Sequence, residues 1–191
     1  QAFEKILNID SHQFDALFNL AVAKAKGGYF EDALAYFRQA QHKQCDNHLL
    51  KANIITVLQE LNRIDEAWRE LRELEPTMRS SQDIRVVEAS LLMKEENYKE
   101  ASILLRILTR EEPQSAKHWL NWSACLKAMK YTVAPEKILK VALLWHPENI
   151  DLQHSFAQSM AEMGQLESYQ RVQQCWQREI SELSTEHVYS R

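Results

Sequence analysis

The sequence predicts an all-α protein built from about five copies of one helix–turn–helix repeat. Its 191 residues include only 3 glycines and 4 prolines, and this scarcity favours long helices over a sheet with many turns. An alanine recurs every 34 residues, at Ala33, Ala67 and Ala101. Pro113 and Pro147 have the same spacing of 34. Because two unrelated landmarks share one period, we infer a structural repeat.

The first full repeat shows why such a unit folds as two helices. Apolar and small residues follow one helical stripe at Leu17, Leu20 and Ala21. Gly27 and Gly28 then end this helix, because glycine adopts the left-handed conformation of a helix C-terminus at little cost. The inner stripe of the second helix consists of Phe30, Ala33, Phe37 and Ala40. One such pair cannot bury both of its faces, so each repeat must stack on the next.

The same pattern predicts boundaries along the chain. We expect the second helix of a truncated repeat at residues 1–10, then repeats at 11–46, 47–80, 81–114, 115–148 and 149–183, and a tail at 184–191. The half repeat indicates a piece of a longer protein. Pro135 and Tyr169 replace the recurring alanine in the last two repeats. Pro135 is acceptable if Thr132 caps its helix, whereas Tyr169 indicates looser packing or another register.

Composition and charge narrow the classes of function. Apolar residues (45%) and charged residues (26%) lie in the usual range of a folded soluble protein. The net charge of −4 gives no electrostatic reason to expect a nucleic-acid partner. No apolar run approaches the ~20 residues of a membrane span, so we expect no membrane partner. The odd count of 3 cysteines favours a reducing compartment, and hence the cytoplasm.

The repeat resembles that of the tetratricopeptide repeat family. That family places a large residue, a leucine followed by a small residue, and then glycine, alanine, an aromatic residue, alanine and proline at fixed offsets. This chain has at those offsets Leu17, Leu20, Ala21, Gly28, Ala33, Phe37, Ala40 and, in place of proline, Cys45. The resemblance covers nearly the whole chain. It implies a right-handed α–α superhelix (a solenoid), whose first helices line a concave groove and which serves as a scaffold for protein binding.

The groove set, as predicted from helical spacing, lies on the side of each first helix opposite the stripe that meets its partner helix. Its members in the five repeats are Asp15, Phe18, Asn19, Val22, Leu49, Ala52, Asn53, Thr56, Asp83, Val86, Val87, Ser90, Lys117, Leu120, Asn121, Ala124, Asp151, His154, Ser155 and Gln158. From this set we expect the partner-binding residues to come.

An asparagine recurs at one slot of this set, in Asn19, Asn53 and Asn121. A carboxamide has an acceptor and two donors, so it pairs with both the C=O and the N–H of a peptide backbone, whatever the peptide's side chains. The column resembles the asparagine ladder in the repeat domain of O-linked N-acetylglucosamine transferases, although Val87 interrupts it. In the alternative, structural interpretation, the amides bond the backbone of the neighbouring repeat and fix the stacking.

A second binding mode in the family is a clamp of lysines and asparagines that holds a C-terminal carboxylate. The corresponding positions in the first repeat are Phe18 and Val22, and neither side chain is a donor. Lys117, Asn121 and Lys127 add positive character in the fourth repeat, where two lysines on a helix face are usually solvated. We therefore retain Lys117 and Lys127 as partner contacts and do not expect a carboxylate clamp.

We expect no catalytic residue, no metal and no cofactor in this chain. His42, Cys45 and His48 are spaced three apart, but they cross a helix end and a loop, and no fourth ligand is evident. Cys125 lies in an apolar helical stretch, and no motif ties a histidine to it. A small core residue is the favoured interpretation of this cysteine.

Three functions remain open. The first is a module that binds an extended peptide or partner segment in the groove. The second is a substrate-recruiting domain of a larger glycosyl-, sulfo- or methyltransferase whose catalytic part lies outside these residues. The third is a spacer that self-associates end to end through Phe3, Ile6 and Leu7. Trp68 and Trp145 on second helices would mark a further partner surface if they are exposed.

Overall fold

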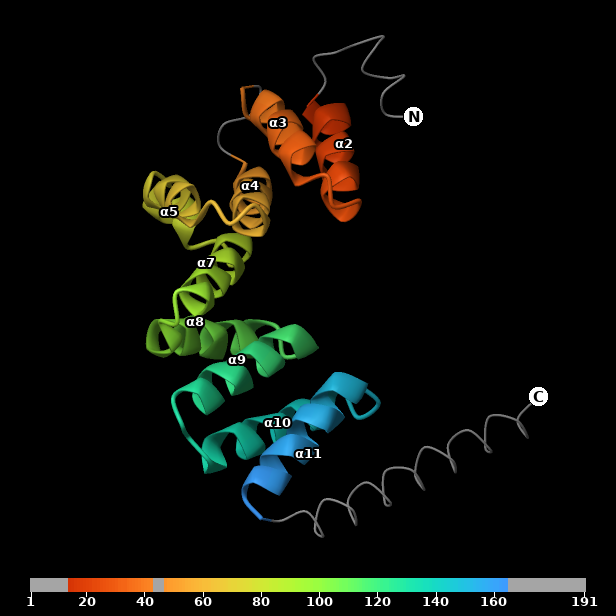
Figure 1. Ribbon diagram of the computed structural model, residues 1–191, viewed down its shortest axis with the longest axis vertical. Helices are drawn as coiled ribbons and strands as arrows, with labels where there is room; N and C mark the ends of the chain where they lie inside the picture. The colour runs from red at the N-terminus through yellow and green to blue at the C-terminus, as the bar shows by residue number, and fades with distance from the viewer. Residues whose placement is uncertain (1–13, 43–46, 165–191) are drawn as a thin grey trace, which may run out of the picture. The chain divides into compact units, whose positions relative to one another are not determined.

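The computed structural model describes residues 14–42 and 47–164. Every regular element in these two ranges is a helix and neither contains a strand, so the predicted all-α class is confirmed (Figure 1). The helices are α2 (Phe14–Lys26), α3 (Phe30–Gln41), α4 (His48–Glu60), α5 (Ile64–Arg72), α6 (Pro76–Arg79), α7 (Gln82–Lys94), α8 (Tyr98–Glu111), α9 (Ala116–Ala128), α10 (Val133–Trp145) and α11 (Ile150–Glu162). The predicted half repeat and the second helix of the fifth repeat lie outside the described residues.

The first helices of the repeats begin at a fixed interval. Helices α2, α4, α7, α9 and α11 start at residues 14, 48, 82, 116 and 150, which are 34 apart. Before α4, Oδ1 of Asn47 accepts a hydrogen bond from the Leu50 N–H at 2.9 Å. Before α11, Oδ1 of Asn149 accepts one from the Leu152 N–H at 3.0 Å. These caps satisfy N–H groups of the first turn, and so help to fix where both helices begin.

The turn inside each repeat contains one residue in the left-handed conformation. These residues are Gly28 (φ 79°), Asn62 (φ 58°), Glu96 (φ 59°), Lys130 (φ 63°) and Gly164 (φ 72°). In four of these turns, the residue after the left-handed one donates a backbone N–H hydrogen bond to the carbonyl five residues before it. The bonds run from Tyr29 to Lys24, from Arg63 to Leu58, from Asn97 to Leu92 and from Tyr131 to Leu126. This is the Schellman ending of a helix. The left-handed residue itself recurs every 34 residues up to Gly164, in the fifth repeat.

Two of these turns offer a stabilising substitution. Glu96 and Lys130 carry a Cβ in a conformation that costs L residues roughly 1–2 kcal/mol, and glycine avoids this cost. We expect Glu96→Gly and Lys130→Gly each to raise the free energy of unfolding by about 1 kcal/mol, net of the chain entropy that glycine adds to the unfolded state. Glu95→Gly is the matched control, since Glu95 has φ −86° and should lose stability as glycine. Urea titrations followed by circular dichroism measure all three variants, and a loss at Glu96 or Lys130 would contradict the strain argument.

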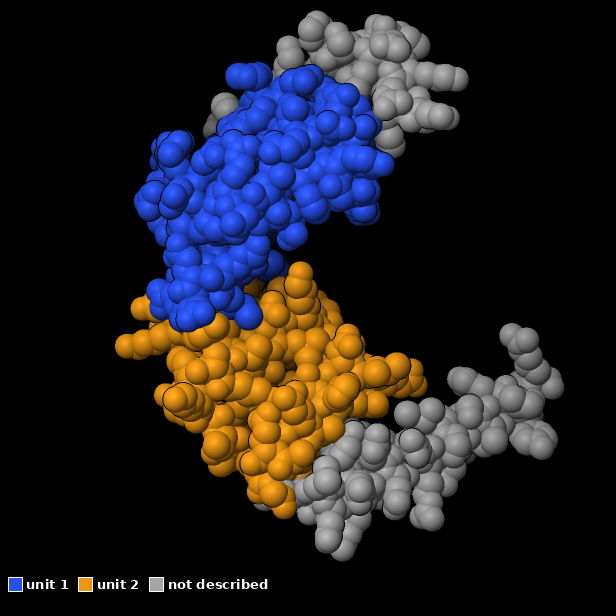
Figure 2. Space-filling view, viewed as in Figure 1, with its two compact units in different colours: residues 1–97 blue, residues 98–191 orange. Residues whose placement is uncertain are grey.

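The chain divides into two compact units, residues 1–97 and residues 98–191, which are described one at a time (Figure 2). In unit 1, α2 packs on α3, α3 packs on α4, and α4 packs on both α5 and α7. The largest fully buried side chains of this unit are Phe37, Leu50, Ile54, Ile55, Leu58, Leu71, Ile84 and Leu91. Ala33 and Ala67 are also fully buried, as expected where helix backbones approach closely.

A buried carboxylate links three helices of unit 1. Oε2 of Glu70, on α5, accepts a hydrogen bond from Nζ of Lys51, on α4, at 2.8 Å, and Oε1 pairs with Arg38, on α3. The side chains of Glu70 and Lys51 are only 11% and 12% exposed. Burial raises the pKa of Glu70, but the hydrogen bonds and positive charges of Lys51 and Arg38 outweigh burial and hold this pKa below its ordinary value. Glu70 is therefore ionised at neutral pH.

In unit 2, α8 packs on α9, α9 on α10, and α10 on α11. A buried cluster of this unit contains Trp119, Leu139, Ala142, Leu143, Leu152, Phe156 and Met160. Nε1 of Trp119 donates a hydrogen bond to the carbonyl of Pro113 at 2.8 Å. One repeat later, Nε2 of Gln153 donates to the carbonyl of Pro147 at 2.6 Å. The recurring proline thus receives a hydrogen bond from the first helix that follows it, in both repeats.

Two local features differ from the expectations. The short helix α6 was not predicted; it begins at Pro76, because proline suits the first helical position. Thr132 precedes α10 as expected, but its side chain makes no capping bond. Pro135 is accommodated without that cap, since it is the third residue of α10, where an N–H has no partner within the helix. Tyr169 lies outside the described residues.

Candidate functional site

The first helices of unit 1 contact one another in sequence order. Helix α2 contacts α4, and α4 packs against α7. Nδ1 of His48 on α4 lies 2.9 Å from Oδ2 of Asp83 on α7. Nζ of Lys94 on α7 donates to the carbonyl of Gln59 at 2.7 Å, and Nε2 of Gln59 donates to the carbonyl of Val87 at 3.3 Å. These bonds hold α7 against α4, so residues at equivalent positions of the two helices keep a fixed spacing and orientation.

The asparagine column has two members in unit 1. Asn19 is exposed on α2, and Asn53 is partly buried on α4. Nδ2 of Asn53 donates a hydrogen bond to the Leu49 carbonyl at 2.8 Å, one turn earlier on its own helix. This bond is not the predicted one to a neighbouring repeat. It leaves the amide oxygen and one amide hydrogen of Asn53 available to a partner.

The other predicted residues of unit 1 have mixed environments. Asp15 and Thr56 are exposed, and Oγ1 of Thr56 donates to the Ala52 carbonyl at 2.9 Å. Phe18 packs on Phe14 and Phe37, with ring centroids 5.8 and 5.7 Å apart, so much of its ring serves the core. Partly buried members of the set are Val22, Val86 and Ser90.

Two members of the groove set in unit 1 do not face solvent. Ala52 and Val87 are only 6% and 7% exposed, and both belong to the core of this unit. The expectation that they line the groove was wrong. Helical spacing shows which side of a helix faces away from its partner, but the neighbouring first helix covers part of that side.

The predicted residues of unit 2 lie on α9 and α11. Lys117 is exposed, while Leu120 and Asn121 are partly buried on α9. Nζ of Lys127 lies 4.0 Å from Oε2 of Glu162 on α11, so this lysine forms an ion pair between two first helices. The other exposed members of the groove set in unit 2 are Ala124, Asp151, His154 and Gln158. Ser155 is partly buried, and its carbonyl accepts a hydrogen bond from the Ser159 hydroxyl.

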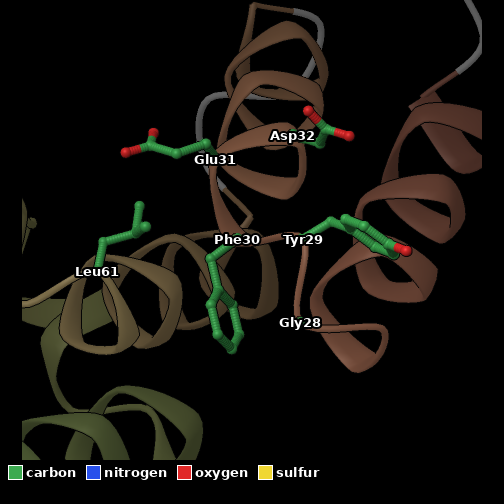
Figure 3. A pocket seen from close by; sticks show the side chains of 6 residues that line it. All are labelled: Gly28, Tyr29, Phe30, Glu31, Asp32 and Leu61. Atoms are coloured by element: carbon green, nitrogen blue, oxygen red, sulfur yellow. The ribbon is translucent and has the colours of Figure 1, made fainter.

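An open cavity of about 290 Å³ lies beside the turn between α2 and α3 (Figure 3). Its lining residues are Gly28, Tyr29, Phe30, Glu31, Asp32 and Leu61, and none of them belongs to the groove set. Both carboxylates already have cationic partners, since Asp32 lies 3.1 Å from Lys24 and Glu31 lies 3.5 Å from Arg63. The cavity therefore contains no free charge that would select a ligand.

Cys125 is fully buried on α9, which confirms the interpretation as a core residue. Burial raises the pKa of its thiol to about 11. At about pH 8, roughly one such thiol in a thousand is ionised, and the sulfur is shielded from solvent. We expect iodoacetamide to leave Cys125 unmodified in the native protein and to alkylate it in urea, as measured by mass spectrometry of its peptide. Equal labelling in both conditions would contradict this assignment.

Two kinds of feature are absent from residues 14–42 and 47–164. No helix in these ranges is both long enough and apolar enough to cross a membrane. The same residues contain no group of three or more histidine, cysteine, aspartate or glutamate side chains arranged to hold a metal ion. Cys45 lies outside the described residues, between His42 and His48.

No protein-family model matches the chain, and no curated protein sequence does. Solved structures match it over most of its length. MamA from Desulfovibrio magneticus RS-1, from residue 41 to its end, is 14% identical with a TM-score of 0.69, over 93% of this chain and 97% of MamA. YrrB, a tetratricopeptide repeat protein with an unusual peptide-binding site, is 16% identical with a TM-score of 0.61, over 88% and 87%. Human IFIT1, from the structure of the IFIT1 dimer with m7Gppp-AAAA, is 18% identical with a TM-score of 0.71, over 88% of this chain and 43% of IFIT1.

These three solved structures are tetratricopeptide repeat proteins, so the repeat fold expected from the resemblance is confirmed. With identities of 14–18%, the similarity concerns the fold alone. The likeness of the asparagine column to that of O-linked N-acetylglucosamine transferases stays a prediction.

Proposed function

We propose that this chain is a protein-interaction module that holds an extended peptide across the first helices of unit 1. The observation that carries the proposal is the pair Asn19 and Asn53, which occupy one slot on the contacting helices α2 and α4. Asn53 uses one amide hydrogen on its own helix, and the side chain of Asn19 has no hydrogen-bond partner among the described residues. Both amides therefore have capacity for a peptide backbone.

The spacing of the two helices suits an extended chain. Packed helix axes lie about 8–10 Å apart, and an extended peptide advances about 3.3 Å per residue. Amides on adjacent helices would thus meet a bound backbone about every three residues. Phe18, Val22 and the 44% exposed Leu49 provide apolar surface nearby, and Asp15 adds a negative charge. We expect peptides that combine apolar side chains with a basic residue.

The fold similarity to YrrB supports a binding role, since YrrB has a peptide-binding site. It does not identify the peptide, because the two sequences are 16% identical. The peptide's chemistry has to be inferred from the surface of this chain.

The double variant Asn19→Ala/Asn53→Ala tests the proposal. Each lost amide bond costs about 1 kcal/mol, or about fivefold in affinity, so the variant should bind about 25-fold more weakly. Peptides selected from a random library on the wild-type protein serve as probes, and fluorescence anisotropy measures Kd. Gln39→Ala, which removes an exposed amide from α3, is the matched control and should bind like the wild type.

Unchanged binding by the double variant, with unchanged thermal melting, would rule the asparagine pair out as the peptide contact. A library that yields no peptide would contradict the proposal itself. Asn121→Ala is measured separately, because Asn121 lies in unit 2.

The two other functions expected from the sequence lead to different observations. As a recruiting domain of a larger transferase, the chain would use the same surface, and a catalytic segment in the full-length protein would distinguish this case. If the chain is a self-associating spacer, its average molar mass in light scattering would rise with protein concentration. A strict monomer would contradict self-association.

A further inference from the structure

A second surface lies in unit 2, where α8, α9 and α10 border a cavity of about 250 Å³. Arg106 and Arg110 come from α8, Trp119 and Trp122 from α9, and Ile138 and Val141 from α10. We name this cavity the Trp–Arg pocket. None of these residues belongs to the groove set, and the peptide site proposed above uses none of them. Ligand pockets usually measure about 300–1,000 Å³, so this one suits a single large side chain better than a whole cofactor.

The α9 side of the Trp–Arg pocket is apolar because both indole N–H groups are already bonded. Nε1 of Trp119 donates to the Pro113 carbonyl at 2.8 Å, and Nε1 of Trp122 donates to Oγ of Ser102 at 3.0 Å. The two ring centroids are 6.1 Å apart with an interplanar angle of 36°. These bonds hold the rings in place before a ligand arrives, so binding sacrifices little side-chain freedom.

The α8 side of the pocket carries positive charge. Arg106 and Arg110 are both exposed and lie one turn apart, on the same face of the helix. Neither arginine has an ion-pair partner within the described part of the chain, and no carboxylate lines the pocket. A guanidinium group pairs with a carboxylate through two parallel hydrogen bonds, so this side is complementary to acidic side chains.

The α10 side of the pocket continues as exposed apolar surface. Val141 is 43% exposed, and Trp145, one turn further along the same face, is 57% exposed. Exposed apolar surface next to unpaired cations is typical of a protein-binding site, in which an apolar anchor is surrounded by polar contacts.

We propose that the Trp–Arg pocket binds an acidic segment of a partner protein. One large apolar side chain of the segment inserts against Trp119, Trp122 and Val141, and flanking carboxylates pair with Arg106 and Arg110. A peptide fits this surface better than a nucleic acid does. Two arginines neutralise few phosphates, and both indole N–H groups are already used, so they cannot read base edges.

Four labelled probes test the proposal on the full chain by fluorescence anisotropy. The first is an acidic peptide of aspartates with one central phenylalanine. The second replaces phenylalanine with serine, the third replaces the aspartates with lysines, and the fourth is an oligouridylate of equal length. We expect the first to bind about tenfold more tightly than each of the others and to weaken at ~1 M salt, where charges are screened. It should also shift the indole N–H resonances of Trp119 and Trp122.

Variants that remove positive charges show which residues contact the acidic peptide. Arg106→Gln/Arg110→Gln should weaken binding of the acidic peptide about tenfold or more. The matched control is Lys137→Gln/Lys140→Gln, which removes the same charge from exposed positions of α10 that do not line the pocket. The control should bind like the wild type, and so should Asn19→Ala/Asn53→Ala, which separates this surface from the proposed groove. The proposal is overturned if the acidic peptide does not bind, if both charge variants weaken it equally, or if the oligouridylate binds more tightly.

Discussion

Replacing Phe37 with alanine should cost about 3–5 kcal/mol of the free energy of unfolding. Phe37 is fully buried on α3, and its ring meets that of Phe18 edge to face, with centroids 5.7 Å apart. Alanine would remove this contact and leave a cavity, because the surrounding helices relax only partly. Urea unfolding followed by circular dichroism measures the loss.

The matched control for Phe37 is Tyr29→Ala, at an aromatic side chain that is 62% exposed, and it should change stability by less than about 1 kcal/mol. Hydrogen exchange adds a second readout. Since each repeat contacts only its neighbours, amides of α2 to α4 should lose protection far more than those of α10 and α11. Equal effects of the two substitutions, or uniform loss of protection, would contradict the packing role assigned to Phe37.

Replacing Glu70 with alanine should cost about 3 kcal/mol, because it leaves the buried ammonium group of Lys51 without its partner. Lys51 is 12% exposed, so water replaces the carboxylate poorly. Glu66→Ala is the control on the same helix, since the side chains of Glu66 and its partner Arg63 are 36% and 37% exposed, and we expect a much smaller loss there. The double variant Glu70→Leu/Lys51→Met should recover most of the loss, because an apolar pair of similar size needs no partner charge.

The contribution of Glu70 also depends on pH in a defined direction. Its pKa is lower in the folded protein than in the unfolded chain, so the unfolded state binds protons more readily. The stabilisation is therefore fully present above the unfolded pKa, about 4.3, and is lost as pH falls through the lower folded value. The stability difference between wild type and Glu70→Ala should be constant from neutral pH to about pH 5 and should shrink below about pH 4. A difference that grows in acid would reverse the assigned direction.

The sequence by itself determined the repeat, the all-α class and the turns. Ala33, Ala67 and Ala101 revealed the 34-residue period, and all three are fully buried. Gly28 predicted the end of the first helix, and it adopts the left-handed conformation. These features depend on residues within one or two helical turns of each other, so spacing along the chain is enough to reveal them.

Only the tertiary structure decided which side chains are free for a partner. It showed that Ala52 and Val87 are covered, that Asn53 bonds its own helix, and that Arg106 and Arg110 lie beside two tryptophans. The partners of Glu70 are 19 and 32 positions away in the sequence, on other helices. A repeat pattern gives every copy of a slot the same expected exposure. The actual exposure and charge pairing of each copy depend on side chains contributed by neighbouring helices, and periodicity contains no information about those contacts.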